Sequence, residues 1–430
     1  MTERKTEGSF LVGMDAHSEK LQLCVCRWIP GGDPKRMESI ATTVDALETT
    51  YAKHVPKGAT TILEASTNAF QIVGRLKKAG YTALVANSDV LTGYARKDRI
   101  NDAIDAYNLA RAYARGAVRP VAVPDATTWQ LRDILHGHEI AKKDAVRASN
   151  RIWSFCNEHG LRYCRSRFTP KTELIRRQIR EEKWSGNECF EVEMRLEDYE
   201  RFCEKRSAYE RRMEQIVSET PAMLRLLQVL GIRYLTAFAL IAYIGDIDRF
   251  NAPKKLVAYF GLNPVVCASG KDEGLGGMSR RGNGIVRAML VEAAQASLRS
   301  GGGNLQKWAR RKLAQGMNRN KVIVAMARKL VMYAWHILKG HPVPNRENEK
   351  SFRAKLLLLA TCLGKEEIRR RGFKDRDAFA ESIAGPLYSH LPPAPEGELQ
   401  TGTAACVEAP PSRPCSQLPS APTEKLHATA

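Results

Sequence analysis

The chain has 430 residues, long enough for two or three domains that each bury a hydrophobic core. Lys and Arg total 67 against 47 Asp and Glu, and the resulting net charge of +20 argues against an enzyme of small metabolites. Such an excess favours a protein that neutralises the phosphates of a nucleic acid. Scattered cysteines, a polar N-terminus and the lack of a long apolar run predict an intracellular protein with reduced thiols and no membrane contact.

The first 120 residues alternate between strand and helix patterns. Short apolar runs predict strands at 9–16, 21–29, 35–43, 59–66 and 81–87, and helical patterns lie at 44–54, at 69–79 and from about 101. The order strand, strand, strand, helix, strand, helix, strand, helix is that of the ribonuclease H fold, a three-layer α/β arrangement. We therefore predict a ribonuclease H-fold domain over residues 9–125.

The rest of the chain is predicted to be mostly helical, so that the fold class is α/β plus mostly α. Charged helical patterns at 138–220 predict a helical hairpin or coiled coil, with a plain helical bundle as the alternative. A mostly helical domain follows at 221–345, and a helical C-terminal extension at 346–390. Residues 391–430 are rich in Pro, Ala, Ser and Thr, which predicts a disordered tail.

Four acidic residues fall where strand ends and a later helix would meet in the ribonuclease H fold. Asp15 ends the first predicted strand, Glu64 ends the fourth, and Asp102 and Asp105 share one face of a helix. Converging carboxylates repel unless divalent cations lie between them, and hard oxygen ligands favour Mg²⁺ or Mn²⁺. Each acid alone has an ordinary explanation as a cap or ion-pair partner, so the metal hypothesis depends on the whole set. An actin-like fold with Asp15 facing a phosphate is the minor alternative, because no duplicated domain is visible.

A glycine-rich stretch, VVCASGKDEGLGGMSRRGNG at 265–284, contains two serines near arginines. From the residues alone, Ser269 and Ser279 are equal candidates for a nucleophile, and each is as easily an ordinary turn serine. We predict phosphate contacts for the segment after Ser269 and for basic residues around it. The predicted nucleic-acid-binding residues are Arg280, Arg281, Arg287 and, on a later helix, Lys321.

The ordered motifs make the sequence similar to the DEDD-type insertion-sequence transposases, which are also described as bridge-RNA-guided serine DNA recombinases. The similarity covers roughly residues 9–340. VGMDAHSEK, ILEAS and NDAIDAYNLAR match the family's acidic motifs, and IGDIDRF, LVAYFGLNP, ASG, SRRGN and ARKLV follow the order of its second domain. The chain departs from the pattern at Ile100-Asn101, where Lys-Thr is usual, and at LGIRYLTA, where Pro-Gly is usual.

This resemblance implies a RuvC-like N-terminal domain followed by a C-terminal transposase domain with a serine nucleophile. Carried over position by position, the metal-binding acids are Asp15, Glu64, Asp102 and Asp105, and the nucleophile is Ser269. These five residues would be catalytic, with Mg²⁺ (or Mn²⁺) as the cofactor. The implied partners are donor and target DNA, a guide RNA encoded by the element, and further copies of the chain in a dimer or dimer of dimers. The implied location is the cytoplasm of a bacterial-type cell, in association with the nucleoid.

The predicted function is therefore that of a transposase that cuts and rejoins DNA strands through a covalent phosphoserine intermediate. The alternative is a metal-dependent endonuclease of the Holliday-junction type, which would use the same acids to activate water and form no covalent link. A third hypothesis is a non-catalytic scaffold that binds nucleic acid. The absence of a Walker-type GxxxxGK[ST] loop fits the first prediction, because a covalent link conserves the phosphodiester bond energy without ATP.

Overall fold

The computed structural model describes residues 9–87, 101–160, 165–166, 169–170, 172–182, 184, 186–269, 272–279, 282–300, 302–341 and 346–388. The tail predicted at 391–430 and the predicted contact residues Arg280 and Arg281 lie outside these ranges. Within them, no helix combines the length and the apolar character that crossing a membrane requires.

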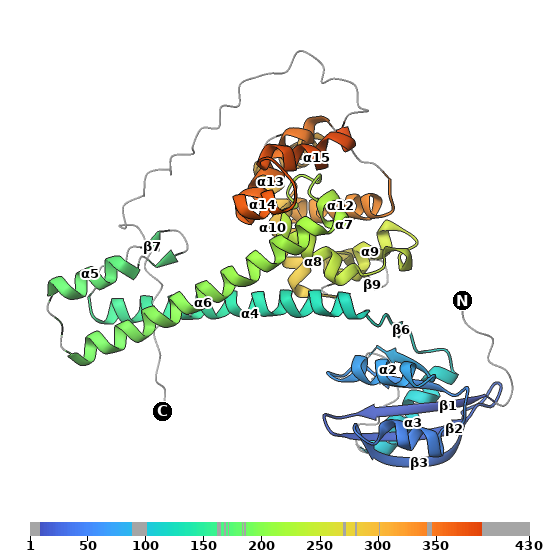
Figure 1. Ribbon diagram of the computed structural model, residues 1–430. Helices are drawn as coiled ribbons and strands as arrows, with labels where there is room; N and C mark the ends of the chain where they lie inside the picture. Colours follow the sequence, from blue (N-terminus) through green and yellow to red (C-terminus); the bar gives the residue numbers. More distant parts are fainter. Residues whose placement is uncertain are drawn as a thin grey trace, which may run out of the picture.

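A six-stranded mixed sheet forms the N-terminal part of the molecule (Figure 1). Its strands are β1 (Phe10–Ala16), β2 (Lys20–Arg27), β3 (Lys35–Thr43), β4 (Thr60–Glu64), β5 (Thr82–Ala86) and β6 (Pro120–Val121). The order is β3-β2-β1-β4-β5-β6. β2 is antiparallel to β1 and β3, β4 is parallel to β1 and β5, and β6 is antiparallel to β5. The first five strands thus have the order expected from the sequence, whereas two-residue β6 is too short to produce a pattern.

Helices cover both faces of this sheet. Val12 and Met14 pack with buried residues of α1 (Leu47–His54) and α2 (Ala69–Lys78). The alternate strand positions, including Leu11 and Ile62, pack against α3 (Asp102–Ala114) on the other face. Because side chains alternate along a strand, β1, β2, β4 and β5 contribute to both cores, and the α/β prediction for this part of the chain is confirmed.

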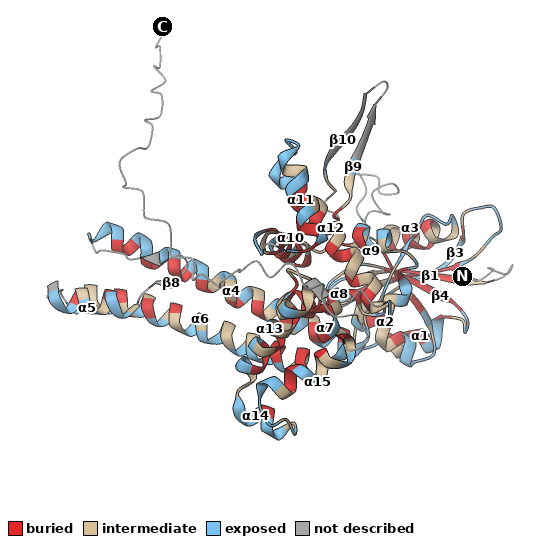
Figure 2. Ribbon diagram, turned by 90° about the horizontal axis from the view of Figure 1, so that it is seen from above, coloured by how far each residue is buried: buried red, intermediate tan, exposed pale blue. Residues whose placement is uncertain are grey.

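Two long helices form a hairpin that extends from the rest of the molecule (Figures 1 and 2). They are α4 (Ala126–Glu158) and α6 (Gly186–Glu219), which pack along one another. Ile152, Phe155 and Leu196 lie in a small core between them. The connection holds β7 (Arg165–Ser166), β8 (Thr169–Pro170) and α5 (Thr172–Glu182).

The prediction that the first of these helices begins near His138 was wrong. α4 begins at Ala126, because the Asp125 carboxylate accepts a hydrogen bond from the Thr128 amide at 2.6 Å and caps the helix. Leu131 and Leu135 then continue the buried face of the helix toward its N-terminus.

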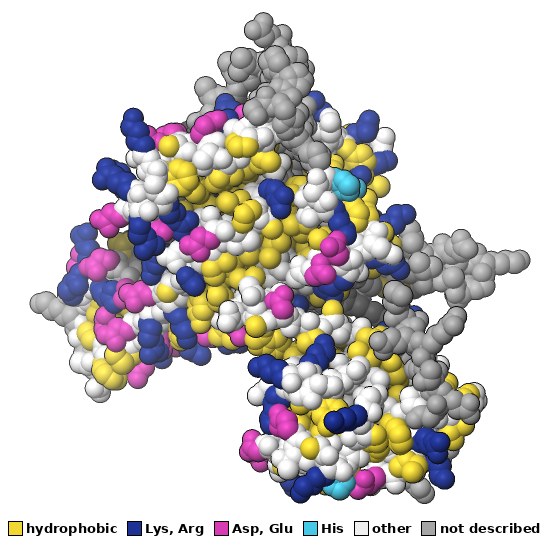
Figure 3. Space-filling model, turned by 45° about the vertical axis from the view of Figure 1, so that its right-hand side comes forward, with side chains coloured by type: hydrophobic (Ala, Val, Ile, Leu, Met, Phe, Trp, Pro, Cys, Tyr) yellow, Lys and Arg dark blue, Asp and Glu magenta, His cyan; other side chains and the backbone are white. Residues whose placement is uncertain are grey.

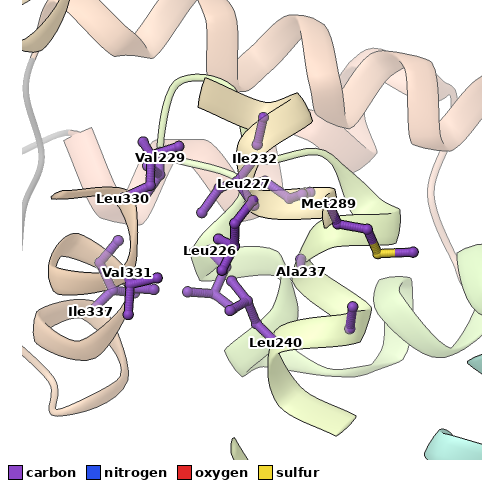
Figure 4. Packing of buried hydrophobic residues seen from close by; sticks show 14 of the residues in the cluster. Leu226, Leu227, Val229, Ile232, Ala237, Leu240, Met289, Leu330, Val331 and Ile337 are labelled. Atoms are coloured by element: carbon purple, nitrogen blue, oxygen red, sulfur yellow. The ribbon is translucent and has the colours of Figure 1, made fainter. Parts of the chain in front are cut away.

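The remaining helices pack around one large core, part of which is shown in Figure 4. Leu226 and Leu240 come from two consecutive helices of this core, and Val331 comes from a third helix later in the chain. The elements are α7 (Pro221–Leu226), α8 (Tyr234–Ile244), η2 (Ile247–Arg249), α9 (Pro253–Tyr259), α10 (Gly284–Arg299), α11 (Asn304–Ala314), α12 (Arg319–Leu338), α13 (Arg346–Leu363), α14 (Lys365–Arg370) and α15 (Arg376–Tyr388). The prediction of a mostly helical remainder is confirmed for the described residues.

The turn between α7 and α8 is part of this packing. Gly231 has a φ of 98°, and a Cβ on it would lie 2.4 Å from the Ala293 carbonyl oxygen of α10. The Lys355 ammonium group donates hydrogen bonds to the carbonyl oxygens of Leu227 and Val229 at 2.7 and 2.8 Å. The turn is therefore held in place by α10 and α13.

The glycine-rich stretch is more regular than the sequence predicted. Strands β9 (Pro264–Ser269) and β10 (Asp272–Met278) pair in an antiparallel ribbon, with Ser269 opposite Asp272. No strand was predicted for residues 272–278, so β10 is an addition to the predicted elements. Once the Val-rich β9 is extended, its backbone amides and carbonyls need partners, and the following segment supplies them despite its low β propensity.

Candidate active site

Asp15 and Glu64 are brought together by the register of two parallel strands. β1 and β4 pair with Gly13 opposite Ile62 and Met14 opposite Leu63, so Asp15 and Glu64 are the next residues along this register. Both acids share a strand face with residues that pack against α3, because side chains two positions apart point the same way. The sheet thus presents two carboxylates at the carboxyl ends of neighbouring strands, on the face that α3 covers.

Close packing of α3 on β1 adds two more carboxylates. A Cβ on Gly13 would lie 1.7 Å from the carbonyl oxygen of Ala106, so only glycine allows the helix to come this near to the strand. Asp102 and Asp105 lie in the first turn of α3, just before that contact. The Asn101 side chain caps the helix by accepting a hydrogen bond from the Ala103 amide at 2.9 Å.

The electrostatics show that these acids form one cluster. Burial raises the pKa of Asp15 above its ordinary value of 3.8; His17 opposes this shift, and the negative charges of Asp102 and Asp105 add to it. Burial also raises the pKa of Glu64, with repulsion from Asp15 and Asp105 as further causes. The pKa of Asp105 is raised by burial and then by Asp102. A bound cation would relieve this mutual repulsion.

His17 also belongs to this cluster, although we did not predict a role for it from the sequence. Its Nε2 atom lies 3.5 Å from an oxygen of Asp15 and 3.7 Å from an oxygen of Asp102. Ligand atoms of Asp15, His17 and Asp102 all lie within 4.8 Å of one another, so these residues could hold a metal ion. The signal in the sequence was the Asp-Ala-His spacing at a strand end, which puts both polar side chains on one face.

Ser269 lies in a different part of the molecule from the acids. It is the last residue of β9, which belongs to the helical body, whereas the acids lie on the sheet and α3 (Figure 1). The other candidate, Ser279, follows β10, and its amide donates a hydrogen bond to the Asn263 carbonyl oxygen at 2.8 Å. The structure therefore groups the four acids with His17, and the serine has to be assigned by other evidence.

The two described residues of the predicted nucleic-acid contact set have different surroundings. The Arg287 guanidinium donates long hydrogen bonds of 3.5 Å to the carbonyl oxygens of Phe260 and Gly282. Lys321 is exposed in the first turn of α12. Their nucleic-acid roles stay predictions.

Comparison with known proteins supplies the family. Residues 12–159 match the DEDD-type IS110 transposase model, and residues 223–311 match the model of the transposase IS116/IS110/IS902 family. The chain belongs to the IS110 family of DEDD-type transposases. The first match includes Asp15, Glu64, Asp102 and Asp105, and the second includes Ser269. Transposases of this family catalyse DNA transposition, so DNA is the substrate of the transposase described here.

Several relatives of this transposase carry related names. The chain is 28% identical over 251 residues to the transposase for insertion sequence element IS1111A of Coxiella burnetii, covering 56% of this chain and 67% of that protein. It is 26% identical over 282 residues to a probable family 20 transposase of Pseudomonas aeruginosa, covering 64% of this chain and 82% of that protein. Among solved structures, Thermus thermophilus RuvC aligns with 26% of this chain and 99% of its own at 14% identity and a TM-score of 0.22.

Proposed function

We propose that this IS110-family transposase exchanges DNA strands through a phosphoserine formed on Ser269, next to a divalent cation held by Asp15, Glu64, Asp102 and Asp105. The observation that carries the proposal is the convergence of these acids at one end of a sheet with ribonuclease H strand order. We assign residues 9–125 to a RuvC-like catalytic domain, 126–219 to the helical hairpin of α4 and α6, and 221–345 to the transposase domain. The resemblance in motif order supports Ser269 over Ser279.

The covalent step conserves the phosphodiester bond. Ser269 Oγ attacks the scissile phosphorus, the Oγ–P bond forms, and the bond from phosphorus to the 3′ oxygen breaks. The proton lost by the serine hydroxyl ends on the released 3′-hydroxyl. Attack of another 3′-hydroxyl on the phosphoserine reverses these changes and joins a new pair of strands, so no nucleotide cofactor is consumed.

The acidic cluster fits a divalent metal. Its donors are carboxylate oxygens and one imidazole nitrogen, and the pKa values of Asp15, Glu64 and Asp105 are raised first by burial and then by neighbouring negative charges. When bound, Mg²⁺ or Mn²⁺ would polarise the phosphate and stabilise its developing charge. Asp15, Glu64, Asp102 and Asp105 would hold the ion, and the imidazole of His17, which lies beside Asp15 and Asp102, would be a further ligand.

Two features of the proposal concern partners. The resemblance in motif order supports an element-encoded guide RNA that pairs with donor and target DNA. It also supports composite sites, in which the acids of one subunit act with Ser269 of another in a dimer or dimer of dimers. The location of the acids and Ser269 in different parts of the chain is compatible with such sharing.

A covalent adduct is the decisive observable. A plasmid carrying the gene with its flanking non-coding DNA is expressed in bacterial cells, and protein-linked DNA is measured after denaturation. We expect the adduct in the wild type and in Ser279→Ala, and its loss in Ser269→Ala and Asp105→Asn.

Other outcomes point to the other candidate functions. Wild-type DNA cleavage without any adduct would identify a metal-dependent endonuclease of the Holliday-junction type. Transposition that persists in Asp105→Asn would show that the acids are not catalytic, as in a binding scaffold.

A further inference from the structure

One long segment of the helical body contains no acidic residue. Between residues 293 and 346 the chain has 11 Lys or Arg and no Asp or Glu. At the average frequency of acids in this chain, a segment of this length would contain about six. The segment includes α11, the turn after it and α12.

The structure gathers a group of these cations on one exposed face. α11 buries Leu305, Gln306 and Ala309. Its opposite side is exposed in Figure 2 and continues through the turn into the first residues of α12. We call this face the α11 surface; its exposed cations are Lys307, Arg310, Arg311, Arg319 and Lys321.

These cations differ from the ion-paired arginines of the α4–α6 hairpin and of α5, which connects its two helices. Arg176, for example, forms ion pairs of 2.7 Å with both Glu193 and Glu200. By contrast, Arg310, Arg311, Arg319 and Lys321 form no ion pair with any carboxylate in the part of the chain that the structure describes. Their charge is therefore not neutralised within the protein and can interact with an external anion.

The geometry favours the backbone of a duplex over unpaired bases. α11 has 11 residues and is therefore roughly 16 Å long, enough to follow several phosphates spaced by about 3.4 Å of axis along one strand. Recognition of single-stranded RNA uses open aromatic faces for base stacking. Trp308 is the single aromatic residue between 302 and 321; it is half-buried, and the Lys329 ammonium lies 5.0 Å from its ring centroid.

We propose that the α11 surface binds the phosphate backbone of duplex DNA, independently of base sequence. The inference rests on the DNA-transposition activity of the family and not on the phosphoserine route. Arg310 and Arg311 would neutralise phosphates and release their counterions, while Arg319 and Lys321 would extend the contact along the duplex.

The test compares two pairs of adjacent arginines on exposed helices. In the full-length chain, Arg310→Gln/Arg311→Gln removes two charges from the α11 surface, and Arg369→Gln/Arg370→Gln removes two from α14. The control pair lies beside Glu366 and Glu367, and Arg370 contacts Glu367 at 2.7 Å. Both variants lower the net charge equally, so bulk charge cannot explain a difference between them.

Binding of a short duplex of arbitrary sequence is measured by fluorescence anisotropy at several salt concentrations, without guide RNA. We expect the α11 variant to lose affinity by about tenfold or more, and its slope of log K against log salt to fall by about two. The control variant should keep the wild-type slope. Thermal melting checks that both variants are folded.

Three results would overturn the proposal: unchanged affinity in the α11 variant, equal losses in both variants, or a loss confined to a structured RNA hairpin tested in parallel. The last result would assign the surface to RNA. Because the assay needs no cleavage, its outcome is independent of Ser269. DNA binding can depend on the α11 surface even if no covalent adduct ever forms.

Discussion

Three carboxylates of the acidic cluster, those of Asp15, Glu64 and Asp105, are held in surroundings that disfavour their charge. Asp105 is partly buried beside Asp102, and the pKa of its carboxyl group is raised. We therefore expect Asp105→Asn to raise the melting temperature of the metal-free protein at neutral pH while it abolishes transposition. Asp45→Asn, which changes an exposed acid outside the cluster, serves as the control and should not raise the melting temperature. A lower melting temperature for Asp105→Asn would show that the aspartate is a structural residue.

The raised pKa values of the acidic cluster also determine how the stability of the folded protein changes with pH. Asp15 and Glu64 have folded-state pKa values above their ordinary values of 3.8 and 4.5. A raised carboxyl pKa contributes stability below the ordinary value, and this contribution is lost as the pH rises through the folded-state value. When a chelator removes divalent ions, the sheet should therefore become less stable as the pH rises from about 4 toward neutrality. Mg²⁺ should restore stability at neutral pH, as calorimetry can show; an identical pH profile in Asp15→Asn/Glu64→Gln would contradict this.

His17 gives a test of metal positioning that is separate from the acids. Its imidazole contacts both Asp15 and Asp102, so His17→Gln should weaken divalent-ion binding by about tenfold and leave the fold intact. The readout is the midpoint of the Mg²⁺-dependent rise in melting temperature. His54→Gln, a surface histidine that contacts Glu38 at 3.0 Å, is the matched control. Equal midpoints for wild type and His17→Gln would remove His17 from the site.

At the scale of elements, the contact between β1 and α3 sets the geometry of the cluster. A Cβ on Gly13 would overlap the Ala106 carbonyl, so Gly13→Ala should cost at least about 3 kcal/mol and move Asp102 and Asp105 away from Asp15. Gly74→Ala is the control, since nothing lies within 4 Å of its Cβ position in α2; it should stabilise by about 0.5–1 kcal/mol. Urea unfolding measures both changes. Similar stabilities of the two variants would mean that α3 adjusts without strain.

The elements also show what the sequence could predict. Apolar runs separated the strands of the sheet, and the positions of Asp15 and Glu64 at strand ends followed directly from them. The early start of α4 depends on the Asp125 cap. A capping residue leaves no mark in the hydrophobic pattern, so the start of this helix was not predicted. β10 was missed because its pairing comes from the neighbouring β9 and not from its own glycine-rich sequence. The contact between His17 and Asp102 could not be predicted, because it depends on where α3 lies relative to β1, and residue patterns do not give that position.

At the scale of the whole molecule, Lys and Arg occur throughout, but their excess over Asp and Glu is concentrated in the helical body. On the face drawn in Figure 3, Lys and Arg side chains occur over both the helical body and the sheet. Residues 221–390 hold 29 Lys or Arg against 12 Asp or Glu, so most of the net charge of +20 lies in the helical body, and this predicts salt-sensitive nucleic-acid binding by that part of the chain. The α11 surface is distinguished by the absence of neighbouring acids and not by its positive charge alone.

The separation of Ser269 from the acids leads to a complementation test. If active sites are shared between subunits, Ser269→Ala supplies intact acids and Asp105→Asn supplies an intact serine. Random mixing in a dimer would make half of the dimers mixed, each with one intact site of two, so about a quarter of the wild-type adduct should return. Each variant alone should give none, and a mixture of Ser269→Ala with Ser269→Ala/Asp105→Asn should also give none. An adduct absent from the first mixture, with mixed dimers demonstrated by differential tags, would place both sets of residues in one subunit.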